Sequence, residues 1–238
     1  MTKTKLFCFP YAGGAAASYN QWKPYFDPDI EFRPIELAAR GRRMREANYA
    51  SIDHAVDDAL KLIKDELLQG PYALCGHSMG SMIAFELAYK ILKNNYPAPV
   101  HIIFSGRAAP QINREKKRRL HHLPDPEFKK ELLGMGGTPK EFFEHPELLE
   151  VFLPLLKGDF RLTETYVHAP KDAPLDCNIT VMSGKKDEDS IEEVEAWTVH
   201  SSRQCNIHYF EGGHFFIHEE PQRVVEIINT AIRNSGLE

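Results

Sequence analysis

Residues 76–80 read Gly-His-Ser-Met-Gly, directly after the short apolar run 72–75 and directly before a helical pattern. A serine between two glycines at this spacing fits a tight turn from a strand into a helix, where close packing leaves little room for side chains. Such a turn strains the serine backbone and holds its hydroxyl in the open. The pattern therefore predicts Ser78 as a nucleophile, with the Met79 N–H at the helix N-terminus facing the place where an oxyanion would form.

Short apolar runs alternate with helical patterns along the rest of the chain. This alternation is typical of an α/β fold, in which a mostly parallel sheet is covered by helices. The sequence predicts strands over residues 6–9, 31–36, 72–75, 100–105, 179–183 and 206–210. It predicts helices over 52–68, along the stripe that follows Ser78, and after Pro221. We expect a single domain over 1–238, because 238 residues of which 42% are hydrophobic can bury a large core.

One region interrupts this alternation. From about residue 107 to residue 176 no strand pattern is present, and short helical pieces are separated by glycines and prolines. We interpret this region as a helical lid inserted in the sheet domain. Its segment 148–156 is apolar on nearly all sides, so it packs on both sides or lines an apolar tunnel. The basic residues within 114–119 fit either a dock for an acidic partner or a solvated helix face.

Charge and hydropathy exclude other classes of protein. The formal net charge of -5 argues against a polyanion-binding protein, so we expect no nucleic acid partner. No stretch approaches the ~18 apolar residues of a membrane span, and the N-terminal apolar run is too short for a signal peptide. We therefore expect a cytoplasmic protein without a membrane partner, and a monomer.

The cysteines and histidines predict no metal site. Cys8, Cys75, Cys177 and Cys205 are scattered and form no C-x-x-C pair, so buried thiols are expected rather than a zinc site or a disulfide framework. His214 and His218 stand four residues apart but lack the adjacent glutamate of a zinc protease helix. We expect no metal and no cofactor.

A serine nucleophile needs a histidine to take its proton and a carboxylate to orient that histidine. In α/β-hydrolases the chain order is serine, acid, histidine, with acid and base on loops after later strands. His214 fits the base, because the strand 206–210 runs into Glu-Gly-Gly-His at 211–214. His77 adjoins the nucleophile on the turn, where neighbouring side chains point apart, so a structural role is expected. His218 would lie a helical turn beyond the loop.

The acid and the oxyanion hole are predicted less sharply. The strand 179–183 leads into three carboxylates within three residues, Asp187, Glu188 and Asp189, and the pattern alone leaves the choice open. The oxyanion hole needs a second N–H from the loop after the first strand. That loop reads Phe-Pro-Tyr-Ala-Gly-Gly at 9–14, and we assign the N–H of Ala12 as the donor beside that of Met79.

Several motifs together resemble the type II thioesterases of nonribosomal peptide and polyketide synthetases. They are Phe-x-Phe-Pro-Tyr-Ala-Gly-Gly at 7–14, Gly-Arg-Arg-Met at 41–44, the 76–80 motif followed by Ala-Phe-Glu at 84–86, Gly-Gly-Thr-Pro at 136–139 and Gly-His-Phe-Phe at 213–216. The resemblance spans nearly the whole chain. It implies an α/β-hydrolase fold, the catalytic residues Ser78, Asp187 and His214, and a preference for Asp187 over Asp189.

The resemblance also implies a function. Type II thioesterases are free-standing editing enzymes that hydrolyse misprimed or stalled acyl groups from the phosphopantetheine thiol of carrier domains. Carrier domains would be the partners, and the phosphopantetheine would belong to the substrate rather than act as a cofactor. Three alternatives stay open: a small-molecule carboxylesterase, a chain-releasing cyclase on the same fold, and a catalytically silent carrier-binding protein.

The chain departs from the family pattern in two places. Residues 38–41 read Ala-Ala-Arg-Gly where Pro-Gly-Arg or Ala-Gly-Arg is usual, and residues 157–160 read Lys-Gly-Asp-Phe where Arg-Ala-Asp-Phe is usual. Neither departure touches the predicted triad. The second lies in the expected lid, where it bears on substrate range or carrier choice.

Overall fold

The computed structural model describes residues 2–112, 119–135 and 145–235, and these residues form a central parallel sheet. The strand order is β2-β1-β3-β4-β5-β6, and every neighbouring pair is parallel. The strands are β1 (Thr4–Phe9), β2 (Ile30–Pro34), β3 (Tyr72–His77), β4 (His101–Ser105), β5 (Asn178–Gly184) and β6 (Cys205–Phe210). The six predicted strands and the α/β fold class are confirmed, with strand ends shifted by no more than two residues.

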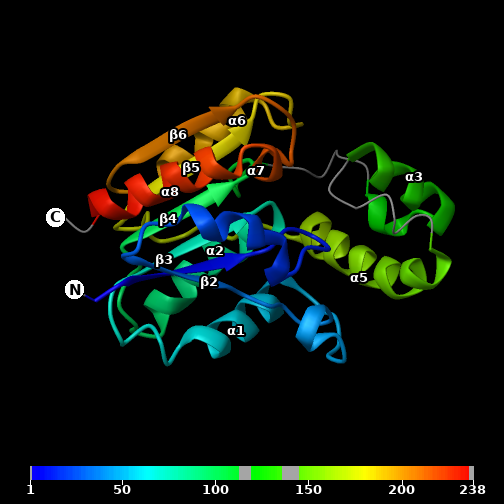
Figure 1. The fold of residues 1–238 in the computed structure, drawn as a ribbon, viewed down its shortest axis with the longest axis horizontal. Coiled ribbons are helices and arrows are strands. Elements are labelled where there is room, and N and C mark those ends of the chain that lie inside the picture. The colour runs from blue at the N-terminus through cyan, green and yellow to red at the C-terminus, as the bar shows by residue number, and fades with distance from the viewer. Residues whose placement is uncertain (1, 113–118, 136–144, 236–238) are drawn as a thin grey trace.

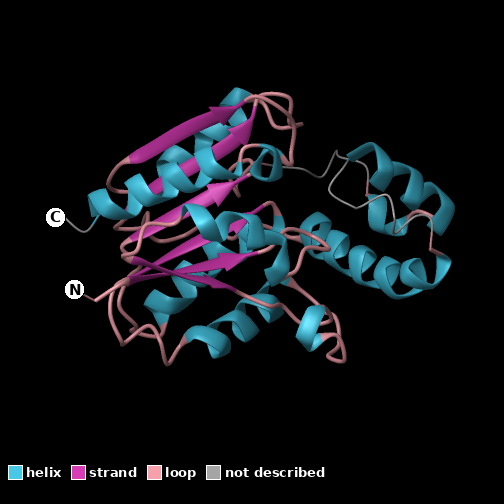
Figure 2. Cartoon of the chain, viewed as in Figure 1, coloured by secondary structure: helices cyan, strands magenta, loops and turns pink. Residues whose placement is uncertain are grey.

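Helices cover both faces of the sheet (Figure 2). The side chains of β1 alternate accordingly, since Phe7 and Phe9 join the core under α1 (Ile52–Ile63) and α2 (Met79–Lys93). On the other face, Leu6 and Cys8 join the core under α8 (Pro221–Ser235) and the 3₁₀ helix η1 (Ala16–Tyr25). A strand buried on both faces reads as a continuous apolar run, which is why the sequence marks it so clearly.

The helix predicted over 52–68 is shorter in the structure. It begins where expected, because the Ser51 hydroxyl accepts a hydrogen bond from the His54 N–H at 3.2 Å and caps the first turn. It ends at Ile63, and residues 64–68 continue as turns that still bury Leu67. The apolar spacing of the sequence therefore extends past the helix, since a turn can present the same face.

The region between β4 and β5 is helical in its described part. It holds the short 3₁₀ helix η3 (Leu120–His122), α3 (Asp125–Met135) and α5 (Pro146–Thr165), and no strand is found among its described residues. Figure 1 shows α3 and α5 beyond the carboxyl ends of the strands, the edge to which the arrowheads point. Both helices share a small apolar core with η3. The Gly-Gly-Thr-Pro motif at 136–139 and the basic residues of 114–118 lie outside the described residues.

The remaining short helices follow β2, β5 and β6 in the chain. They are η2 (Gly41–Arg43), α6 (Ile191–Glu195), η4 (Ala196–His200) and α7 (Phe216–Glu219). None of the helices that the structure describes combines the length and the hydropathy needed to cross a bilayer.

Buried histidines make the stability of this fold sensitive to acid. His101 on β4 is 2% exposed, and its two ring nitrogens lie 2.8 Å from the hydroxyls of Ser235 and Thr180. Burial lowers the pKa of His101 from 6.5 to about 4, and the pKa of His200 falls equally far for the same main reason. The unfolded chain therefore takes up protons first as the pH falls. The stabilisation by the neutral rings is present above about pH 6.5 and is lost between about pH 6.5 and 4.

We predict that the free energy of unfolding falls as the pH drops from about 6.5 to about 4. His101→Gln should flatten this dependence, because it removes one of the groups that protonates only on unfolding. Urea unfolding across this pH range measures the slope, with His122→Gln at an exposed position as the matched control. Equal slopes for the two variants would contradict the assignment to His101.

Candidate active site

Ser78 lies at the end of β3 and caps the N-terminus of α2. Its backbone angles, φ 54 and ψ -112, are ones that side-chain-bearing residues rarely adopt. Close backbone packing imposes this turn. A Cβ at Gly76 would overlap the carbonyl of Gly80, and a Cβ at Gly80 would overlap the carbonyl of Phe9. The two glycines of the motif are therefore required where α2 packs against β3 and β1.

A second serine, which the sequence pattern did not single out, supports this turn. The Ser81 hydroxyl is fully buried, lies 2.8 Å from the Gly76 carbonyl oxygen and accepts the Ser105 N–H at 2.9 Å. The Ser78 N–H in turn donates to the Ser105 carbonyl at 2.7 Å. The nucleophile turn is thus hydrogen-bonded to the end of β4. A serine one turn into a helix is ordinary in sequence, so no local signal marks it.

His214 follows β6 and faces the loop that follows β5. Its Nδ1 lies 2.8 Å from Asp187 Oδ2, and the Asp187 side chain is only 5% exposed while that of His214 is 30% exposed. The other carboxylate oxygen of Asp187 accepts the Glu188 N–H at 2.7 Å. A carboxylate at Nδ1 places the proton there and leaves Nε2 as the basic nitrogen. The imidazole is therefore oriented and only partly covered.

Asp189 has a different contact. Its Oδ2 accepts the Ala108 N–H at 2.7 Å, which ties the loop after β5 to the chain that leaves β4. The structure thus brings Asp187, and not Asp189, to the Nδ1 atom of His214. Asp187 and Asp189 lie only two residues apart in one loop. Which of them reaches His214 therefore depends on the geometry of that loop and not on its composition.

His77 lies beside the site but points into the protein. It is fully buried, its Nδ1 lies 2.9 Å from the Ser105 hydroxyl, and no hydrogen-bond partner of its Nε2 is found among the described residues. Its ring centre is 5.0 Å from that of His214. Burial first, and then the neighbouring His214 and His218, lower the pKa of His77 well below its usual value. The ring is neutral and packs behind His214.

His218 contacts the loop after β1 rather than the acid. Its Nε2 lies 3.0 Å from the hydroxyl of Tyr11, and its Nδ1 lies 2.5 Å from the side-chain nitrogen of Gln21. Burial lowers its pKa. His214 and His218 therefore face different partners, and among the described residues no three His, Cys, Asp or Glu side chains gather as a metal site.

The two predicted oxyanion donors come from different segments, Met79 directly after Ser78 and Ala12 after β1. Met79 begins α2, so its N–H is at the positive end of the helix dipole. Ala12 lies in the turn after β1, which closes with a hydrogen bond from the Gly14 N–H to the Tyr11 carbonyl at 2.9 Å. Within the described part of the chain, neither the Ala12 N–H nor the Met79 N–H has a hydrogen-bond partner. Both remain able to donate to a bound oxyanion.

These groups open into one large cavity of about 2020 Å³. Ser78, Asp187, His214 and Ala12 line it from the sheet domain. Apolar side chains of α3 and α5 line the opposite side, namely Leu132, Phe152, Leu155 and Leu156. An apolar wall facing a nucleophile suits an acyl chain whose carbonyl carbon is attacked at the mouth of a tunnel.

Comparison with known proteins gives a consistent family. The thioesterase domain model matches residues 4–232. The chain is 36% identical over 234 residues to the protein named Linear gramicidin dehydrogenase LgrE from Brevibacillus parabrevis, covering 96% of this chain and 88% of the relative. It is 35% identical to the gramicidin S biosynthesis protein GrsT from Aneurinibacillus migulanus, covering 97% and 90%. The crystal structure of ClbQ from the colibactin NRPS/PKS pathway matches with a TM-score of 0.94 at 34% identity, covering 99% of both chains.

We predict that Gly76→Ala destabilises the protein by several kcal/mol and removes its activity, because the new methyl group meets backbone rather than a side chain that can rotate away. Gly134→Ala in α3 is the matched control, since a methyl group there meets nothing within 4 Å. The control should be neutral, or more stable by roughly 0.5–1 kcal/mol through helix propensity. Thermal unfolding of both variants measures the difference, and an unchanged Gly76→Ala melting temperature would be incompatible with the packing described.

Proposed function

Because this chain belongs to the thioesterase domain family, we propose that it is a free-standing editing thioesterase of a peptide or polyketide synthetase. It hydrolyses aberrant or stalled acyl groups from the phosphopantetheine thiol of carrier domains. The observation that carries the proposal is the 2.8 Å contact between His214 Nδ1 and Asp187 in the cavity that Ser78 lines. ClbQ is named as a protein of the colibactin NRPS/PKS pathway and GrsT as a gramicidin S biosynthesis protein, and these names support the substrate class.

The proposed mechanism uses an acyl-serine intermediate. Asp187 holds the His214 proton on Nδ1, so Nε2 takes the proton of the Ser78 hydroxyl as its oxygen attacks the thioester carbonyl. The N–H groups of Met79 and Ala12 stabilise the oxyanion. When the tetrahedral intermediate collapses, the carbon–sulfur bond breaks and His214 protonates the leaving thiolate. His214 then takes a proton from water, which attacks the acyl-serine and releases the acid and the free serine.

This scheme needs no cofactor, because the only co-substrate is water and no electrons are transferred. The phosphopantetheine arrives with the carrier domain. The name of LgrE assigns a dehydrogenase activity to that protein. In the present chain the loop after β1 reads Phe-Pro-Tyr-Ala-Gly-Gly and lacks the G-x-G-x-x-G pattern of a dinucleotide site. Consumption of a reduced nicotinamide in an acyl-carrier assay would favour the dehydrogenase reaction instead.

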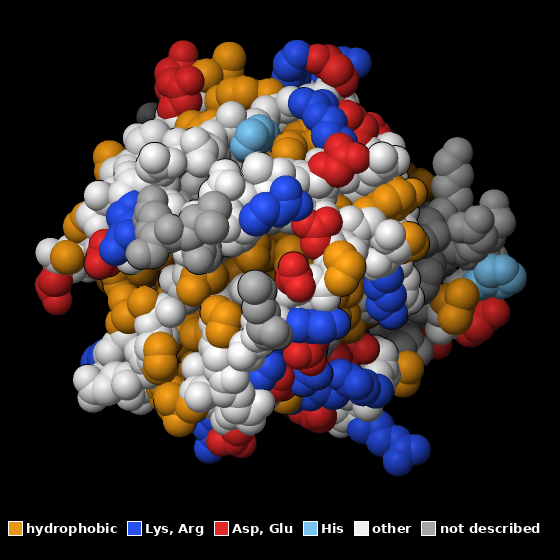
Figure 3. Space-filling view, turned by 60° about the vertical axis from the view of Figure 1, so that its left-hand side comes forward, with side chains coloured by type: hydrophobic (Ala, Val, Ile, Leu, Met, Phe, Trp, Pro, Cys, Tyr) orange, Lys and Arg blue, Asp and Glu red, His pale blue; other side chains and the backbone are white. Residues whose placement is uncertain are grey.

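We further propose that residues 107–176 act as a lid over the cavity and that the carrier domain docks at its rim. Of the basic segment that suggested a docking site, only Arg119 is described, and it lines the cavity. On the face drawn in Figure 3, Lys and Arg side chains are interspersed with Asp and Glu side chains, so that face presents no broad field of one sign. The protein is proposed to act as a monomer in the cytoplasm, where its free cysteines would stay reduced.

Substitution of the triad tests the mechanism. Ser78→Ala and His214→Ala should each lower kcat for an acyl-carrier thioester by about 10³-fold or more, with unchanged circular dichroism. Asp187→Asn should cost far more activity than Asp189→Asn, since the amide oxygen introduced by the latter change can still accept the Ala108 N–H. Near-normal turnover by Ser78→Ala would contradict the mechanism, whereas absence of turnover by the wild type would support the carrier-binding alternative. A larger loss in Asp189→Asn would move the acid to Asp189.

Carrier dependence tests the substrate class. We expect kcat/KM for acetyl-carrier to exceed that for acetyl-pantetheine at 0.1 M ionic strength. If steering by charge contributes, the preference should shrink at 1 M, where the Debye length falls from about 10 Å to about 3 Å. The variant Lys116→Ala, Lys117→Ala, Arg118→Ala removes the basic segment, and Lys61→Ala, Lys64→Ala at exposed positions near the end of α1 is its control. Equal rates on the two substrates would instead point to a small-molecule esterase.

A further inference from the structure

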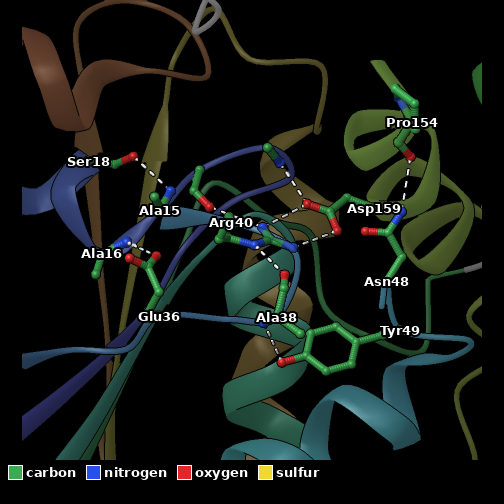
Figure 4. Close-up of polar contacts among 12 residues, drawn as sticks. Ala15, Ala16, Ser18, Glu36, Ala38, Arg40, Asn48, Tyr49, Pro154 and Asp159 are labelled. Carbon is green, nitrogen blue, oxygen red and sulfur yellow. Dashed lines mark hydrogen bonds and ion pairs between the residues drawn. The ribbon is translucent and has the colours of Figure 1, made fainter. Parts of the chain in front are cut away.

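Arg40 and Asp159 form a buried ion pair between the loop after β2 and the middle of α5 (Figure 4). Two guanidinium nitrogens donate to the two carboxylate oxygens at 2.8 and 2.9 Å, and both side chains are only 3% exposed. The pair joins residues 119 positions apart in the chain. An ion pair removed from water in this way requires close geometry and additional hydrogen bonds to offset its desolvation.

Those additional hydrogen bonds connect the pair to the loop after β1, which contains the predicted oxyanion donor Ala12. Asp159 Oδ2 also accepts the Gly13 N–H at 2.7 Å, and Arg40 Nη1 also donates to the Gly14 carbonyl at 3.0 Å. The third nitrogen, Arg40 Nε, donates to the Ala38 carbonyl at 3.0 Å. The pair therefore holds the two residues that follow Ala12. Ala12 itself lines the cavity, directly before the held Gly13 N–H.

Helix α5 also packs directly on this loop. Gly13 has φ 76, a conformation that is strained for other residues, and a Cβ there would lie 2.5 Å from Leu156 Cδ2, so the Leu156 side chain would have to move. At the next turn, Gly158 makes room for Asn48, whose amide nitrogen donates to the Pro154 carbonyl at 3.2 Å. The C-terminal half of α5 is thus fixed to the sheet domain at several places, although the sequence assigns it to the inserted region.

Backbone strain marks the other end of the pair. Ala39 has φ 64, in the left-handed region that favours glycine. For alanine this conformation is strained. The strain persists because the neighbouring contacts determine the loop, among them the Ala39 N–H, which donates to the Arg43 carbonyl at 3.1 Å. The strained residue lies directly before Arg40, whose guanidinium group contacts Asp159.

We propose that Arg40 and Asp159 are positioning residues for the oxyanion hole. They hold the peptide groups of Gly13 and Gly14 so that the Ala12 N–H points at the oxyanion, and they make this geometry depend on the docking of α5. Neither side chain touches the reacting atoms. The inference rests on the proposed function, because Ala12 acts only if Ser78 attacks a carbonyl carbon.

Replacing both residues of the ion pair distinguishes an effect on catalysis from an effect on the stability of the fold. The double variant Arg40→Met, Asp159→Leu removes the pair without leaving a buried charge, so the melting temperature should stay close to that of the wild type. It also leaves the Gly13 N–H without an acceptor, so kcat on acetyl-pantetheine should fall about 10- to 100-fold while KM changes little. Asp159→Asn keeps an acceptor for the Gly13 N–H but leaves Arg40 without a counter-charge. It should be less stable than the double variant and yet more active.

A tetrahedral-adduct probe reports on the oxyanion hole itself. Butylboronic acid forms a bond from boron to Ser78 Oγ, the hydroxyl proton passes to His214, and the anionic adduct places an oxygen at the Ala12 and Met79 N–H groups. Its affinity should fall by the same factor as kcat in the double variant, whereas the product pantetheine should bind as to the wild type. If the pair only stabilised the fold, replacing it would change the affinities for butylboronic acid and for pantetheine by similar factors.

The matched control lies on the same loop. Arg43 pairs with Asp58 through two hydrogen bonds of 2.7 and 3.1 Å but does not contact residues 13–14. Arg43→Met, Asp58→Leu should retain kcat and boronate affinity. If the Arg40 double variant does not fold, the singles Asp159→Asn and Asp58→Asn carry the same comparison. Wild-type kcat in the Arg40 double variant, or activities that simply follow melting temperature, would overturn the proposal. Hydrolysis by Ser78→Ala would instead overturn the proposed function.

Discussion

The close contact between the N-terminal turn of α2 and the ends of β1 and β3 is the constraint on which the site depends. Gly80 lies against the Phe9 carbonyl, and Gly76 lies against Gly80, so strand and helix meet backbone to backbone. Because Phe9 ends β1, the same contact keeps the loop with Ala12 next to the turn with Ser78. This one contact between the strand ends and the helix therefore places both Ser78 and the predicted oxyanion donors.

The histidines around the site differ in their surroundings: His77 is fully buried, whereas His214 and His218 are half-buried. Burial lowers the pKa of both His77 and His218, while Asp187 lies at His214 Nδ1. A positive charge that forms on His214 during catalysis therefore has a carboxylate beside it and neutral rings behind it. The carboxylate of Asp187 thus contacts His214, while the rings of His77 and His218 contact the hydroxyls of Ser105 and Tyr11.

The inserted region has two parts that differ in what they contact. The C-terminal half of α5 is joined to the sheet domain through Asp159, Gly158 and Leu156. Helix α3 packs on η3 and α5 and is held by contacts such as that between Asp125 and Lys157. Among the described residues, α5 therefore contacts both the loop after β1 and α3.

The sequence by itself determined the features that depend on local patterns. Strands buried on both faces give continuous apolar runs, and the turn that holds Ser78 needs glycines at fixed positions. Both features could therefore be predicted from the sequence. The glycines before His214 indicated its exposed loop in the same way. Tertiary structure decided the rest. That Asp187, and not Asp189, lies at His214 Nδ1 depends on where the loops after β5 and β6 meet, beside the close approach of Gly184 to Gly213. The link from Arg40 through Asp159 to Gly13 joins three segments distant in the chain, and only the packing of α5 on the sheet domain brings their polar groups within hydrogen-bonding distance.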